Sequence, residues 1–176
     1  MRVFTIVLLL VGCTSQAVPT LTGAKCPDPS NPQFTYHNFM YDFNCKYCDN
    51  CHDSALKLNA RNGAPLFHNL DTLVGTMEVW QHTDEQAGWG PKAHNNFMPG
   101  GGTAGKCPST QGGSLDEDCP EPTDQERENL STFIACEVQR PQDYNGSNAA
   151  AADVTDHCAS FIATGGPPPD AGVDAQ

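Results

Sequence analysis

The chain has 176 residues, a formal net charge of -12 and nine cysteines. This length accommodates one modest domain with flanking segments rather than two packed domains. Because the acidic chain contains no basic block, a phosphate backbone would be repelled, which excludes nucleic acid as the expected partner. The 16 glycines and 14 prolines predict irregular segments between the ordered elements and few long helices.

Residues 1–12 resemble an export signal, because a short apolar run follows a basic residue and is too short to span a bilayer. The sequence Leu10-Val11-Gly12-Cys13 also resembles the lipobox of bacterial lipoproteins. This resemblance implies cleavage before Cys13, lipidation of its sulfur and a membrane-tethered mature chain; a plain secretory signal ending near Ala17 is the alternative. Residues 13–33 would then hold the lipid anchor and a Pro/Ser/Thr-rich spacer.

Apolar residues at helical spacing predict two helices in the first half of the chain. The first is expected over about residues 35–50, where its apolar face would comprise Tyr36, Phe39, Met40, Phe43 and Tyr47. The second covers about residues 70–80, with Asn69 or Asp71 as a possible N-cap. A long loop rich in Gly, Asn and Pro follows, and a compact domain rarely carries such a loop without a function or an internal anchor.

A third helix is predicted to begin at Thr123, because Thr123 and Glu126 form a capping-box pattern. It should end at about Arg140, since Pro141 follows. Residues 141–176 are rich in Ala, Pro and Gly, so we expect a largely irregular tail, partly tied by Cys158.

The segment Cys45-Lys46-Tyr47-Cys48-Asp49-Asn50-Cys51-His52 contains three cysteines at three-residue spacing. An iron–sulfur motif would require a fourth cysteine at position 55, which is Ala55. A zinc site would require a second close pair, whereas the chain offers only the scattered Cys107 and Cys119. The last five residues match the C-x-x-C-H attachment site of c-type haem. Two cysteines three residues apart share a helix face, so both thiols can reach one edge of a haem.

From about residue 34 to residue 140 the chain resembles a class I c-type cytochrome, with one haem and His/Met ligation. The family order is kept: a helix entering CDNCH, a proline in RNGAP, a loop carrying NFMPGG and a closing helix. The resemblance implies haem thioethers at Cys48 and Cys51, axial iron ligands at His52 and Met98, and a possible contact of the Pro65 carbonyl with the His52 ring. Residues 34–140 would therefore form an all-α domain of about three helices around one covalent haem c.

Some assignments within this resemblance stay open. Bis-histidine ligation is an alternative to Met98, and the candidate ligands are His37, His68, His82 and His94, of which His94 is nearest to Met98 in sequence. Trp80 and Trp89 could approach the haem propionates, although core packing is the simpler role for Trp80. Met40 and Met77 lie on apolar helix faces and are expected in the core.

Six cysteines remain after lipidation and haem attachment, an even number that suits an exported chain. Six cysteines allow 15 pairings. We favour three that close short loops: Cys26–Cys45, Cys107–Cys119 and Cys136–Cys158.

These patterns together predict a non-enzymatic electron carrier, tethered by lipid and facing the periplasm or lying at the outer membrane. Its partners would be redox proteins and the membrane, with no small-molecule substrate. A haem-free, disulfide-rich lipoprotein that acts as a binding or structural module, with all eight remaining cysteines paired, is the main alternative. A third possibility keeps the haem but leaves its sixth coordination position open for ligand chemistry.

Overall fold

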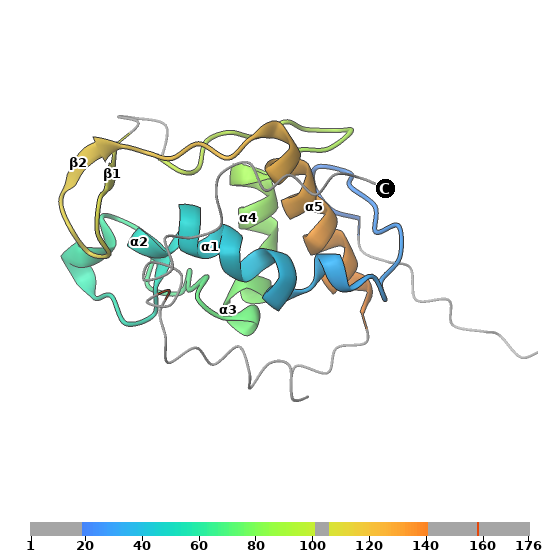
Figure 1. Ribbon diagram of the computed structural model, residues 1–176, viewed down its shortest axis with the longest axis horizontal. Coiled ribbons are helices and arrows are strands. Elements are labelled where there is room, and N and C mark those ends of the chain that lie inside the picture. The colour runs from blue at the N-terminus through green and yellow to red at the C-terminus, as the bar shows by residue number, and fades with distance from the viewer. Residues whose placement is uncertain (1–18, 101–105, 141–157, 159–176) are drawn as a thin grey trace, which may run out of the picture.

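The computed structural model describes residues 19–100, 106–140 and Cys158. Five α-helices, a two-stranded antiparallel sheet and short helical turns at Pro32–Phe34, Tyr36–Met40 and Leu58–Arg61 form the regular structure of this part. Figure 1 shows α5 and the N-terminal segment at one end of the molecule, and α2 with the β-hairpin at the other. None of the helices in the described ranges is long and apolar enough to cross a bilayer.

The first predicted helix is confirmed as an almost continuous helical run. A π-helical turn, Tyr36–Met40, leads into α1 (Tyr41–Tyr47) and, after an interruption at Cys48, into α2 (Asp49–His52). The run is capped by Thr35, whose hydroxyl accepts a hydrogen bond from the Asn38 amide at 3.3 Å. The expected apolar face is largely buried, comprising Tyr36, Met40, Phe43 and Tyr47.

The second predicted helix is divided at Val79 into α3 (Leu73–Glu78) and α4 (Trp80–Ala87). Its N-cap is Thr72, whose hydroxyl accepts a hydrogen bond from the Gly75 amide at 3.0 Å; neither predicted capping residue fills that role. The helical region extends beyond the last apolar residue of the predicted stripe to Ala87, and the Gly-rich loop follows from Gly88 as expected.

The third predicted helix, α5 (Asp124–Gln139), has the expected ends. Thr123 accepts from the Glu126 amide at 3.2 Å, and the Glu126 carboxylate accepts from the Thr123 amide at 2.8 Å. This reciprocal pair satisfies two amide donors that a helix start leaves without partners. The apolar stripe of α5 is fully buried at Leu130, Phe133 and Ile134, and forms the centre of the core with the first helical run.

The all-α prediction is wrong, because β1 (Lys106–Pro108) pairs antiparallel with β2 (Leu115–Asp118). All four residues of β2 are exposed, so the strand has no buried face and shows no alternation of apolar and polar residues. Gly112, with φ of 68°, supplies a left-handed turn conformation between the strands. The Cys107–Cys119 disulfide, paired as predicted, closes the hairpin.

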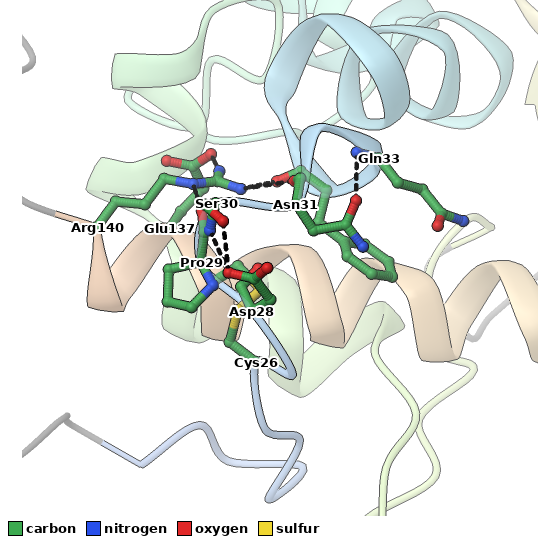
Figure 2. The surroundings of a disulfide bond; sticks show 10 residues. Cys26, Asp28, Pro29, Ser30, Asn31, Gln33, Glu137 and Arg140 are labelled. Carbon is green, nitrogen blue, oxygen red and sulfur yellow. Dashed lines mark hydrogen bonds and ion pairs between the residues drawn. A yellow bond between two sulfur atoms is a disulfide. The ribbon is translucent and has the colours of Figure 1, made fainter.

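Residues 19–34, which we call the strap, lie against the helical domain rather than acting as a free spacer. The strap is joined to α5 by the Cys26–Cys136 disulfide, which we call the strap disulfide. Figure 2 shows Arg140 beside Glu137 and Asn31 in the surroundings of this bond; its guanidinium donates to the carbonyls of Pro29 at 2.8 Å and Phe34 at 2.6 Å. The strap is therefore part of the folded domain.

The other predicted long-range pairings are also wrong, because Cys45 pairs with Cys158 and Cys26 pairs with Cys136. The prediction joined cysteines that close short loops, whereas these bonds join residues 110 and 113 positions apart. Helix packing brings the ends of the domain together, and such proximity is not encoded in local spacing.

Candidate functional site

The two cysteines of the C-x-x-C-H segment lie in one helical turn and form no disulfide. Cys51 N donates to Cys48 O at 3.1 Å, and His52 N donates to the same carbonyl at 3.0 Å, so the three side chains leave one short stretch of backbone. Six of the eight cysteines in the described ranges are paired, and Cys48 and Cys51 are the two that remain. Burial raises the pKa of both thiols, which disfavours the thiolate form that zinc binding and disulfide exchange require.

The ring of His52 is oriented by a backbone carbonyl. Its Nδ1 lies 3.1 Å from His68 O, so in the tautomer that donates this hydrogen bond Nε2 is an unprotonated lone-pair donor. Burial lowers the pKa of His52 to about 4, which keeps the imidazole neutral at neutral pH. A neutral imidazole with one nitrogen held by a carbonyl is the usual state of a metal-binding histidine.

The carbonyl that faces His52 Nδ1 is that of His68 rather than that of Pro65, for which a contact with the ring was only a possible role. Pro65 O instead accepts from the His68 amide at 3.0 Å and from the Arg61 guanidinium at 2.8 Å. The proline belongs to the turn that places His68.

Arg61 organises this turn, and sequence reasoning missed it. Its guanidinium, 1% exposed, donates to five groups around the loop: Asp53 O at 2.8 Å, Ala64 O at 3.3 Å, Asn69 Oδ1 at 3.0 Å, Pro65 O at 2.8 Å and His68 O at 2.7 Å. One side chain thus fixes both the segment that leaves α2 and the carbonyl that faces His52. Its only signal in the sequence is a lone arginine in a polar loop, which carries no chemical pattern.

Met98 is held by its backbone on both sides. Its amide donates to Gln86 O in α4 at 2.9 Å, and its carbonyl accepts from Arg127 Nη1 of α5 at 2.8 Å. Arg127 is 2% exposed and also donates to Ala87 O at the end of α4 and to Asn95 O of the same loop. Its Nη2 forms an ion pair with Glu121 at 3.0 Å. The long loop therefore has an internal protein anchor, which the sequence did not reveal.

Met98 and Cys48 are both partly buried and pack against the same core cluster. This shared packing joins the loop to the attachment segment through the core.

The candidate alternative ligands fall into two groups. The rings of His52 and His68 lie 6.1 Å apart, and those of His68 and His82 lie 5.1 Å apart, so these three histidines are neighbours. His94 instead stacks on Trp89 at 4.3 Å. Proximity therefore favours His68 and His82 over His94 as competitors of Met98. His37 is exposed beside Tyr36, and Trp80 packs against the core as expected.

Large apolar side chains are exposed on the segments next to these residues. Five of the seven exposed in the described ranges lie between positions 58 and 97: Leu58, Leu66, Phe67, Val74 and Phe97. Leu58 and Phe67, 75% and 63% exposed, lie in the segment between α2, which we call the attachment helix, and α3, and Phe97 precedes Met98. Exposed apolar groups of this size suit the binding of a large apolar ligand. With the two unpaired thiols and the oriented imidazole, the residues present fit a covalent haem.

The β-hairpin is hydrogen-bonded to α2 and to the loop that follows it. Asn50 Nδ2 donates to Pro108 O at 3.0 Å, Gly112 N donates to Asn50 O at 3.2 Å, and Asn62 Nδ2 donates to Gly113 O at 3.1 Å. These contacts fix the attachment helix against the disulfide-closed hairpin (Figure 1). The hairpin thus supports the site, a role that the irregular sequence did not indicate.

Ligand atoms of Cys45, Asp49 and Cys158 also lie within 4.8 Å of one another. Because the two sulfurs are joined in a disulfide, neither is a thiolate, and this group does not form a metal centre.

Cys13, and with it the lipobox, lies outside the described residues, as do the signal segment 1–12 and nearly all of the tail 141–176. Comparison with models of known families, with characterised proteins and with solved structures found no match.

Proposed function

We propose that the chain transfers single electrons through one covalently bound haem c, with thioethers at Cys48 and Cys51 and axial ligands His52 and Met98. A bound haem would supply the one-electron Fe(III)/Fe(II) couple at this position. The observation that carries the proposal is the pair of unpaired cysteines beside a histidine whose Nδ1 faces a carbonyl. The other six described cysteines form disulfides, so the two cysteines that remain free are those of the C-x-x-C-H motif.

The buried environment of the two thiols supports thioethers rather than thiolates. A thioether sulfur is uncharged, so it avoids the desolvation penalty that a thiolate would incur among the apolar groups of the core. Zinc binding is disfavoured further because Cys107 and Cys119 are joined to each other and cannot complete a four-ligand set.

Met98 is proposed as the sixth ligand because its loop is held in place by protein contacts alone. The hydrogen bonds from Arg127 and to Gln86 limit the positions of its backbone. A pre-positioned thioether loses little conformational freedom when it binds a metal, and a thioether ligand raises the potential of a haem relative to a second imidazole.

The remaining parts of the proposal concern location and partners. The lipobox-like segment supports lipidation at Cys13, export and a membrane tether facing the periplasm or lying at the outer membrane. Redox proteins would dock briefly at the haem edge, and no substrate turnover is proposed. The three disulfides suit an oxidising compartment.

Haem attachment is tested by producing the chain together with cytochrome maturation factors and recording the pyridine haemochrome spectrum. We expect one haem c per chain, and loss of the covalent haem in the double variant Cys48→Ser and Cys51→Ser. The matched control replaces Cys107 and Cys119 by serine, which removes two cysteines outside the motif and should leave the haem in place. A chain without haem under these conditions would refute the proposal and favour the disulfide-rich binding module.

Ligation by Met98 is tested separately in the oxidised holoprotein. We expect the weak Met–iron charge-transfer band, its loss in Met98→Leu, and its retention in the control Met77→Leu, since Met77 lies in the core. A band already missing from the unmodified protein would exclude Met98 and point to His68, His82 or an open sixth position.

A further inference from the structure

The folded domain begins close to the proposed lipid anchor. The amide and hydroxyl of Thr22 donate to the buried Asp84 carboxylate at 2.8 and 2.9 Å, and Thr22 O accepts from the Lys92 amide at 2.8 Å. Thr20 is also buried, at 3% exposed. Only six residue steps separate Cys13 from residue 19, the first described residue, and a fully extended chain covers about 21 Å over that length. A lipid at Cys13 would therefore hold this end of the domain near the bilayer.

We call the surface around this point the tether surface, formed by Leu21, Lys25, Trp89, Lys92 and His94. Leu21 is 48% exposed, and the side chain of Lys92 lies along Gly23, where a Cβ would come within 2.7 Å of its Cγ. An open pocket of about 560 Å³ lies between residues 23–25 and 89–94. Trp89 lines this pocket with His94 stacked on it. Aromatic, apolar and lysine side chains at one place are typical of a surface at the membrane–water interface.

The charge distribution points to the same surface. In the described ranges, Lys46 and Lys106 form ion pairs with carboxylates, whereas Lys25, Lys57 and Lys92 form none. Two of these three unpaired lysines belong to the tether surface of a chain whose net charge is -12. Glu128 is the one carboxylate among the residues that line the pocket. Lysines without carboxylate partners are free to contact anionic lipid headgroups.

We propose that the tether surface lies on an anionic lipid bilayer and that the attachment helix α2 points away from it. Figure 1 shows the N-terminal segment and α2 at opposite ends of the molecule, so a bilayer at the first would leave the second open to soluble partners. This inference rests on the lipid tether of the proposed function. To that tether it adds an orientation: the tether surface contacts the membrane, and the end that carries α2 contacts the redox partner.

Lysine labelling tests the orientation in the lipidated holoprotein. The protein is bound to vesicles of phosphatidylethanolamine and phosphatidylglycerol, modified with a membrane-impermeant amine reagent, and compared with the protein on neutral phosphatidylcholine vesicles. We expect Lys25 and Lys92 to react about fivefold more slowly on the anionic vesicles. Lys57, which is exposed and follows α2, is the internal control and should react equally on both.

A pair of matched variants checks the role of charge. Lys25→Glu should restore fast labelling of Lys92 on anionic vesicles, whereas Lys57→Glu should leave Lys92 protected. If each of the three lysines reacts at the same rate on anionic and on neutral vesicles, or if only Lys57 reacts more slowly on the anionic vesicles, the proposed orientation is overturned. The mass of the N-terminal peptide shows whether the chain is lipidated and so distinguishes failure of the orientation from failure of the tether. A lipidated chain with unprotected Lys25 and Lys92 overturns only the orientation. An unlipidated chain overturns both the tether and the orientation. The haem proposal is judged by the haemochrome spectrum in either case.

Discussion

A buried carboxyl beside the Cys45–Cys158 disulfide makes the stability of the domain depend on pH. Asp49 is 4% exposed, its Oδ1 has no hydrogen-bond partner, and it lies next to disulfide sulfurs that carry no hydrogen to donate. Burial, with smaller contributions from the charges of Asp53 and Asp71, raises the pKa of Asp49 from 3.8 to about 8. At neutral pH the folded protein therefore keeps this carboxyl protonated, whereas the unfolded chain ionises it.

The sign and size of the effect follow from these two pKa values. Below about pH 4 the carboxyl is protonated in both states, so it contributes no pH dependence to the free energy of unfolding. Between about pH 4 and pH 8 only the unfolded chain loses the proton, so the free energy of unfolding falls by about 1.4 kcal/mol per pH unit, or about 6 kcal/mol in full. Water entry and relaxation around the carboxyl reduce such penalties, so we expect a loss of about 2–4 kcal/mol across this interval.

The variant Asp49→Asn removes the titration and keeps the C-x-x-C-H pattern. Denaturant unfolding of both proteins from pH 4 to pH 8.5 should show the variant gaining about 2–4 kcal/mol relative to the unmodified protein as pH rises. Any constant cost of burying the amide cancels in this comparison. The control Asp116→Asn, in exposed β2, should show no such trend. A difference between Asp49→Asn and the unmodified protein that stays constant with pH would refute the reasoning.

Three further predictions concern the groups that hold the site. Arg127→Lys keeps one charge but cannot reach the carbonyls of Ala87, Asn95 and Met98 together, so the Met98 charge-transfer band should weaken and the protein should lose about 2–3 kcal/mol of stability in denaturant unfolding. An unchanged band would show that the loop is positioned by other contacts. Arg61→Lys should free the carbonyl facing His52 and shift the haem reduction potential in voltammetry, while the haem content stays at one per chain; an unaltered potential would contradict the orienting role. Serine in place of both cysteines of the strap disulfide should lower the free energy of unfolding by about 2–5 kcal/mol, and a loss of under about 0.5 kcal/mol would mean that the strap is held by its hydrogen bonds alone.

The features that could be predicted from the sequence are local ones. The capping pair Thr123 and Glu126 and the apolar stripe after them specify α5, because both signals act within a few residues. The spacing of Cys48 and Cys51 likewise places both thiols and His52 in one helical turn, because residues three positions apart lie on the same face of a helix.

The features that could not be predicted depend on residues distant in the sequence. The partner of Cys26 lies 110 residues away and is brought near only when the strap packs on α5. Arg61 and Arg127 act through backbone carbonyls, which every residue carries, so no residue pattern marks their partners. The exposed β2 strand lacks the alternation by which a strand is recognised.

The Cys45–Cys158 bond also has a consequence for the order of events during biogenesis. Its two cysteines are 113 residues apart, and a chain that emerges from its N-terminus exposes Cys45, Cys48 and Cys51 long before Cys158. During that interval all three thiols compete for oxidation, and a bond between Cys45 and Cys48 would block attachment of the cofactor. Attachment of the proposed haem would therefore require this segment to stay reduced until Cys158 is available, so we expect thiol reduction to be a step in the maturation of the protein.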